Sequence, residues 1–102
     1  MLSLITVSKA QKKLAENTRL QRLKADLTQQ GLAERSGVAL PTLRKFEQKG
    51  FISLEGFLKL QIVLGGLENI IKAIQPEQYY FSSIDEVLET DKITTRKRGS
   101  RK

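Results

Sequence analysis

Apolar residues recur at helical spacing along most of this 102-residue chain. The clearest pattern lies in residues 27–50, LTQQGLAERSGVALPTLRKFEQKG, and it predicts two short helices joined by a tight turn. Thr28 is suited to cap the first helix, whose Leu32 and Ala33 then face inward. Gly37 stands where a helix commonly ends in a left-handed residue, so the turn is predicted there.

The second of these helices is predicted to have one inward and one outward face. Ala39, Leu43 and Phe46 are spaced at i, i+4 and i+7, which places them together on the inward face. Gly50 is expected to end the helix. The pattern predicts a helix-turn-helix whose second helix can enter a DNA groove. The outward face of that helix carries Pro41, Arg44, Lys45 and Gln48.

The residues on either side of this pattern predict further elements. Residues 1–7, MLSLITV, are apolar and β-branched, and we expect an extended arm or an edge strand, covered either by its own domain or by a partner chain. Ser8 is predicted to cap a long basic helix that runs to about Ala25. That helix has no single apolar stripe, so it is either covered on two sides or broken in register. Phe51 and Ile52 are expected to pack back on the domain.

Two more helices are predicted towards the C-terminus. Ser53 is expected to cap helix 54–64, which is apolar on most sides and has Glu55 and Lys59 as an i, i+4 pair on its solvent side. A Gly-Gly pair stops it, and a second helical run follows before Pro76. This run has an aliphatic stripe that suits either the core of the domain or the seam of a homodimer, and we favour the seam. The stripe consists of Leu67, Ile70, Ile71 and Ile74.

The last part of the chain has a different character. Residues 76–89 are predicted to be a short docking segment, because their aromatic cluster and capping box need a surface to pack on. Residues 90–102, TDKITTRKRGSRK, have no apolar pattern and are expected to be disordered when free. We favour a role for this tail at DNA phosphates or in the minor groove, with contact to a partner protein as the alternative. The pattern as a whole predicts an all-α fold: a five-helix domain over residues 9–75, preceded by an arm over residues 1–8.

Charge is unevenly distributed along the chain. Residues 1–50 have ten basic and four acidic side chains (+6), residues 51–89 have two and six (−4), and residues 90–102 have six and one (+5), which gives the net charge of +7. A basic front half and a basic tail suit a chain that meets a polyanion with one face. Taken alone, however, the charge is better explained by ordinary solvated side chains.

The composition excludes several classes of function. The chain has no cysteine and no histidine, which excludes disulfides, thiolate chemistry and the usual zinc sites. Its other reactive side chains form no recognisable catalytic arrangement, so we expect no enzyme activity, no metal and no cofactor. No apolar run approaches the length of a membrane span and the first residues lack the charged start of a signal peptide, so we expect a cytoplasmic protein without membrane contact.

The pattern LTQxxLAxxSGVxxxTLxxFExxG over residues 27–50 resembles, without a gap, the helix-turn-helix of the Cro/phage-repressor family, also called the xenobiotic-response-element type. Two departures from the family pattern matter. Gly31 replaces a helix former, and Ala39 replaces the usual Ser or Thr cap, each at about 1 kcal/mol. The resemblance implies DNA contacts from the start of the first motif helix and the outward face of the second. The matching residues are Thr28, Gln29, Leu40, Pro41, Thr42, Arg44, Lys45 and Gln48.

The same resemblance implies an ion pair. Relatives have an arginine six residues before the Thr-Gln pair, and it pairs with the glutamate that ends the second motif helix. The matching residues are Arg22 and Glu47. Glu47 stands beside the inward face, where an unpaired carboxylate would be costly, so we predict a structural salt bridge with no catalytic role.

The wider layout resembles the small regulators encoded beside HipA-type serine/threonine kinases. The matching segments are SLEGFLKL, LGGLENI, a proline, SIDEVL and RKRG, and the likeness is weaker beyond Gly66. It implies a HipB-like antitoxin, or an antitoxin-associated repressor, that represses its own operon and binds a HipA-type kinase toxin. We expect a homodimer on double-stranded operator DNA, because one motif module covers too little DNA for a tight specific site. Two alternatives stay open, namely a phage-type or housekeeping repressor without a toxin partner, and a protein-binding adaptor that has lost DNA binding.

Overall fold

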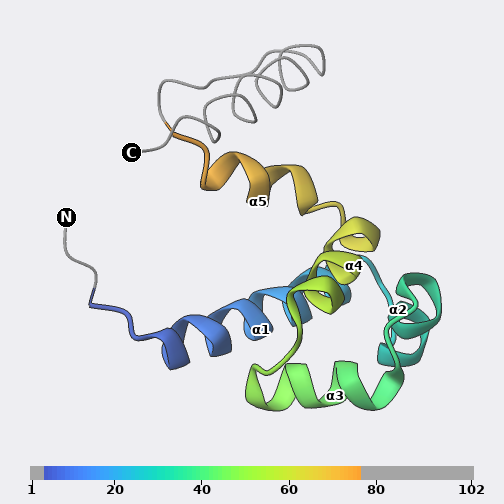
Figure 1. Ribbon diagram of the computed structural model, residues 1–102. Helices are drawn as coiled ribbons and strands as arrows, with labels where there is room; N and C mark the ends of the chain where they lie inside the picture. The colour runs from blue at the N-terminus through green and yellow to red at the C-terminus, as the bar shows by residue number, and fades with distance from the viewer. Residues whose placement is uncertain (1–3, 77–102) are drawn as a thin grey trace, which may run out of the picture. The chain divides into compact units, whose positions relative to one another are not determined.

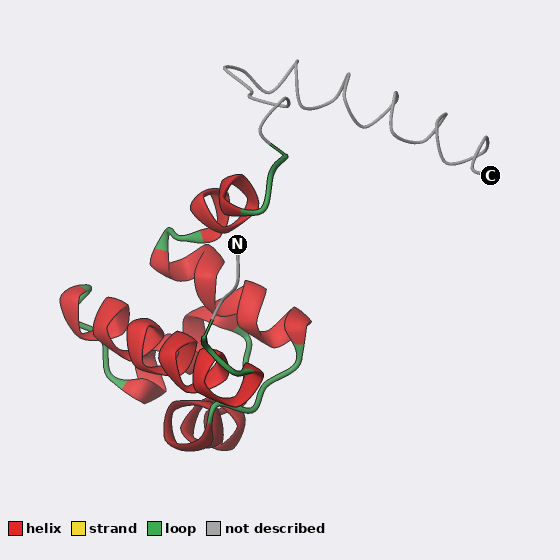
Figure 2. Cartoon of the chain, turned by 90° about the vertical axis from the view of Figure 1, so that its left-hand side faces the viewer, coloured by secondary structure: helices red, strands yellow, loops and turns green. Residues whose placement is uncertain are grey.

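The computed structural model of the protein describes residues 4–76, and these residues form five α-helices and no strand (Figures 1 and 2). The predicted all-α class is therefore confirmed for this part of the chain. Contacts divide the chain into two units, residues 1–69 and 70–102, with the boundary inside the last helix. The predicted docking segment after Pro76 and the predicted tail lie outside the described residues. The helices are α1 (Val7–Lys24), α2 (Gln29–Ser36), α3 (Leu40–Lys49), α4 (Leu54–Leu64) and α5 (Leu67–Ala73).

The start of α1 corrects the prediction for the N-terminal arm. Thr6, rather than Ser8, is the capping residue: its backbone is extended and its hydroxyl accepts the backbone N–H of Lys9 at 3.1 Å. Val7 is consequently helical, so only residues 4–6 of the described arm are non-helical, and they form no strand. Both Thr and Ser are good caps, and the earlier one prevails because each residue added to an existing helix gains a backbone hydrogen bond. One such bond joins the N–H of Ala10 to the carbonyl of Thr6 at 2.9 Å.

The ends of the middle helices follow the predicted residues. Thr28 and Ser53 cap α2 and α4 through their hydroxyl oxygens, whereas Ala39 makes no side-chain cap at α3. Gly37 and Gly50 end α2 and α3 with φ of 81° and 85°, in the left-handed region that glycine tolerates. Gly50 has a second constraint, because a Cβ at this position would lie 3.1 Å from a backbone atom of Gln11 in α1.

The core lies where α1 and α2 pack against α3 and α4. Phe46 of α3 is buried and meets Phe57 of α4 edge to face, with ring centroids 6.0 Å apart. Two predicted core positions are wrong. Ala39 is exposed, because it precedes the first helical residue and so does not follow the helical spacing, and Phe51 is 53% exposed. The buried apolar side chains are Ala15, Leu32, Ala33, Val38, Leu43, Phe46 and Leu60.

The buried face of α1 is narrow and largely polar, which settles how this helix packs without a clean apolar stripe. Its buried residues are Ala15, Thr18 and Arg22. Leu14, Leu20 and Leu23 stay about half exposed. The helix thus buries one face only, and hydrogen bonds connect that face to α4. The side-chain amide of Gln61 donates to the Thr18 hydroxyl at 3.3 Å and to the side-chain oxygen of Gln21 at 2.9 Å.

Candidate nucleic-acid interface

One face of α3 is solvent-exposed and rich in polar and basic side chains. Leu43 and Phe46 are buried, and they fix which side of the helix turns to solvent. Five of the six predicted contact residues of α3 follow this division, because Pro41, Thr42, Arg44, Lys45 and Gln48 are exposed. Leu40 does not, because it is partly buried and packs against the core. Glu47 is the only acidic residue of the helix and it is turned to the interior, so the exposed face is positively charged.

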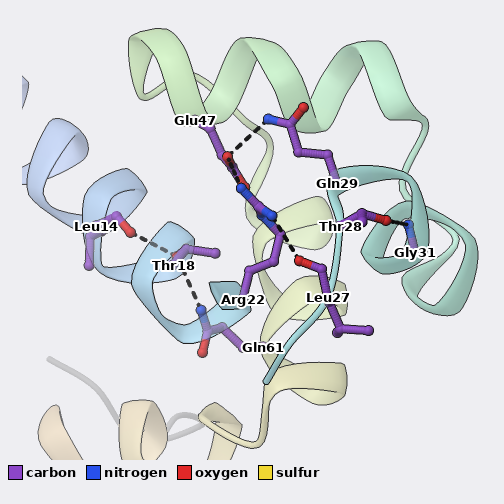
Figure 3. Close-up of polar contacts among 9 residues, drawn as sticks. All are labelled: Leu14, Thr18, Arg22, Leu27, Thr28, Gln29, Gly31, Glu47 and Gln61. Atoms are coloured by element: carbon purple, nitrogen blue, oxygen red, sulfur yellow. Dashed lines mark hydrogen bonds and ion pairs between the residues drawn. The ribbon is translucent and has the colours of Figure 1, made fainter. Parts of the chain in front are cut away.

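Glu47 is held by a buried hydrogen-bonded ion pair with Arg22, as Figure 3 shows. Nε of Arg22 donates to Oε2 of Glu47 at 2.8 Å, and Nη2 donates to Oε1 at 3.1 Å. Nη1 of Arg22 donates to the backbone carbonyl of Leu27 at 2.8 Å. The two side chains are 9% and 4% exposed, so this predicted salt bridge is present and shielded from water. It ties the end of α1 to α3 and to the residue that leads into α2.

The start of α2 is bound to the same carboxylate. The side-chain amide of Gln29 donates to Oε1 of Glu47 at 3.0 Å (Figure 3). Thr28 uses its hydroxyl to accept the backbone N–H of Gly31 at 2.9 Å, and the residue is exposed. The structure therefore brings Gln29 against α3, whereas Thr28 caps α2. The bond from Gln29 to Glu47 was not predicted, because residue spacing does not show which way a half-buried amide turns.

The C-terminal end of α3 adds two features that the sequence reasoning missed. The ammonium of Lys45 lies 6.0 Å from the ring centroid of Phe51, at the outer limit of a cation–π contact. Lys49 is exposed and stands four residues after Lys45, on the same side of the helix. The i, i+4 spacing of the two lysines was a signal that could have included Lys49 in the basic face.

The N-terminal end of α3 has no side-chain cap. Ala39 has no side chain that can cap it, and Pro41 in the first turn has no N–H. Pro41 and Thr42 are exposed at this end and offer apolar atoms and one hydroxyl, while Leu40 beside them is partly buried against the core. The chemistry of the whole face is thus that of hydrogen-bond donors and positive charge at one end and small apolar contact at the other.

Comparison with family models, curated proteins and solved structures gave no match for this chain. The candidate site therefore rests on its residues and geometry.

Residues 4–76 contain no group of acidic side chains that could hold a metal ion. None of the five described helices is long and apolar enough to cross a membrane. The dimer candidates differ in burial. Leu67 and Ile70 of α5 are partly buried, whereas Ile71 of α5 is 53% exposed and Ile74, in the turn after α5, is 81% exposed.

Proposed function

We propose that this protein binds double-stranded DNA at specific sequences and acts as a transcriptional repressor. In this proposal α2, the turn at Gly37 and α3 are a helix-turn-helix, and α3 enters the major groove. The observation that carries the proposal is the exposed, positively charged face of α3, whose single carboxylate is bound internally by Arg22. A helix that is held in place by the rest of the domain and has exposed basic side chains is suited to bind a polyanion such as DNA. Contacts of basic side chains with phosphates supply much of the binding free energy.

Each predicted residue has a role that its chemistry allows. Arg44 and Lys45 can donate to O6 and N7 of guanine, and Leu40 and Pro41 can contact a thymine methyl group. Polar contacts from the remaining residues fix the register of the protein on DNA. These residues are Thr28, Gln29, Thr42 and Gln48.

Two copies are part of the proposal. One module of this size covers too little DNA for a tight specific site, and pairing two modules multiplies their binding. A homodimer would read two half-sites about 34–36 Å apart, which is one turn of the DNA helix. We place this activity in the cytoplasm, with no enzymatic step and no cofactor.

The antitoxin form of this function is narrower. It rests on the resemblance to HipB-like regulators, whose C-terminal segments SIDEVL and RKRG match residues outside the described part of the chain. Co-purification of the full chain with the product of the adjacent gene tests it. A stable complex with a HipA-type kinase supports the antitoxin role, and its absence leaves the phage-type or housekeeping repressor.

The DNA site can be identified and then used to test α3. Genomic fragments retained by the purified protein are sequenced, and the affinity for the site found is measured by fluorescence anisotropy over a series of salt concentrations. The test variant is Arg44→Ala/Lys45→Ala. The control Lys59→Ala/Lys72→Ala removes two positive charges from α4 and α5, so both proteins have the same net charge.

The two variants should distinguish sequence-specific base contacts from the general electrostatic attraction of the protein to DNA. Loss of a bidentate base contact should cost about 1–3 kcal/mol per residue, and each 1.4 kcal/mol is a tenfold loss of affinity. The α3 variant should fold normally, since both side chains are exposed, and should lose its preference for the site over scrambled DNA. The control should keep that preference. Equal affinity of the α3 variant and the parent protein for the site would show that this face does not read DNA.

A further inference from the structure

An apolar groove of about 210 Å³ lies between the first half of α1, the end of α3 and the start of α4. Leu14 and Leu54 stand on its two sides and are 48% and 72% exposed. The groove is smaller than the 300–1,000 Å³ typical of sites for drug-sized ligands. Its size suits aliphatic side chains better than a small molecule. Its lining includes Gln11, Leu14, Phe46, Ile52, Leu54 and Phe57.

The start of the chain carries aliphatic side chains of the kind that fit such a groove. Leu4 is 93% exposed and Val7 is 77% exposed, so neither is seated in the groove of its own chain. Val7, Gln11 and Leu14 are spaced at i, i+4 and i+7 and therefore share one face of α1. Val7 therefore shares a face of α1 with two residues that line the groove, Gln11 and Leu14, and exposed Leu4 lies three residues before it in the chain.

We propose that the groove and these exposed side chains together bind a second copy of the chain. A surface that carries both an insert and its receptor is self-complementary, and a two-fold axis lets each copy supply what the other receives. Two α1 helices would lie antiparallel, with Leu4 and Val7 of each copy covering the groove beside Leu14 and Leu54 of the other. The inference rests on the two-copy part of the proposed function and names the contact surface. The contact is small beside the roughly 800 Å² per partner of a standard interface, so the dimer should dissociate on dilution.

Charge gives this contact a distinctive dependence on salt. The first half of α1 carries Lys9, Lys12 and Lys13, and its first acidic residue is Glu16. Antiparallel pairing brings two such basic segments together, and salt screens the repulsion between them. Dimerisation through this surface should therefore strengthen as salt rises. DNA binding should weaken with salt, because it releases counterions from the phosphates.

Cross-linking tests the contact directly, because the chain has no cysteine of its own. Full-length Leu4→Cys with a C-terminal tag is mixed with untagged Leu54→Cys under mild oxidation. The control replaces the second variant by Glu34→Cys, whose position on α2 is exposed and outside the groove. We expect the mixed-size disulfide dimer to form several-fold faster with Leu54→Cys than with Glu34→Cys. Equal rates would overturn the proposal.

Sedimentation of a second set of full-length variants covers the case in which the cysteines disturb the contact. Leu4→Asp/Val7→Asp should raise the dimer dissociation constant at least tenfold, and the new carboxylate at position 7, in the first turn, favours α1. Ile74→Asp places the same change in the other candidate dimer contact, the aliphatic stripe of residues 67–74. Loss of the dimer in Ile74→Asp alone, or a parent protein that stays monomeric at high salt, would overturn the proposal. If the cross-linked dimer forms but does not bind a specific DNA site, only the proposed DNA function is refuted. If the protein binds paired half-sites but the cross-link does not form, only the proposed dimer surface is refuted.

Discussion

Replacing Glu47 by alanine should destabilise the protein far more than a surface substitution does. In the structure its carboxylate accepts three hydrogen bonds: two from Arg22 at 2.8 and 3.1 Å and one from Gln29 at 3.0 Å. Removal of the carboxylate leaves the guanidinium of Arg22 buried and without its counter-charge. The loss therefore combines the missing bonds with the penalty for an unpaired buried charge.

The magnitude follows from the burial of the pair. Breaking a buried ion pair by removing one partner costs roughly 3–5 kcal/mol. Arg22 keeps its bond to the carbonyl of Leu27, so we expect a value near the lower end, about 3 kcal/mol. A small domain has a stability of about 5–15 kcal/mol, so Glu47→Ala removes a large fraction of it.

The chain offers a matched control for this substitution. Glu55 and Lys59 form an exposed i, i+4 ion pair with 3.4 Å between Nζ and Oε2. Such exposed pairs contribute about 0.3–0.5 kcal/mol, so Glu55→Ala should barely change stability. Urea unfolding followed by far-UV circular dichroism gives the free energy of unfolding for both variants and for the parent protein.

A double variant separates the charge from the packing. Arg22→Met/Glu47→Met removes both charges and keeps much of the side-chain volume, so it should be less destabilised than Glu47→Ala. Glu47→Ala costing no more than Glu55→Ala would refute the reasoning, because the buried pair would then contribute nothing beyond a surface pair. A double variant as unstable as the single one would show that packing or the bond to Leu27, and not the unpaired charge, determines the loss.

Two further predictions use other features of the chain. Gly37→Ala should cost about 1–2 kcal/mol through its left-handed backbone alone, since no atom lies within 4 Å of the added Cβ. Gly50→Ala should cost about 1 kcal/mol more, because its Cβ meets the backbone of Gln11, and equal losses in thermal or urea unfolding would contradict that contact. Truncation after Glu89 removes a net charge of +5 and should weaken DNA binding at low salt without changing the preferred site. Unchanged anisotropy titrations at low salt would exclude the tail from DNA contact.

The local chemistry of the chain predicted much of the fold. Ser53 and Gly50 mark helix ends where the sequence placed them, because a hydroxyl that accepts an N–H and a residue free to adopt positive φ act within a few positions of themselves. The inward face of α3 followed from the spacing of Leu43 and Phe46. The buried pair of Arg22 and Glu47 is a different case, because it came from a family resemblance and not from spacing.

The errors occur where local signals compete or where the outcome depends on distant residues. Thr6 and Ser8 were both able to cap α1, and sequence alone did not show that the earlier one prevails. The exposure of Phe51 depends on how the loop after α3 turns, which no periodicity describes. The amide contacts of Gln61 reach back 40 residues to Gln21, and a polar residue in an apolar run gives no indication of its partner.

The polar buried face of α1 has a consequence for how exactly this helix is aligned. A shift of α1 along its axis by one turn moves each side chain by about 5.4 Å. Aliphatic contacts would exchange one neighbour for another in such a shift, but Arg22 would leave Glu47 and Thr18 would leave Gln61, since both contacts need hydrogen-bond distance. The helix therefore has a single favourable alignment, which is set by directional hydrogen bonds. Because Arg22 binds Glu47, this alignment also fixes the position of α3 relative to α1. Substitutions at the half-exposed leucines of α1 can therefore alter the stability of the protein without changing the alignment of α1 against α3.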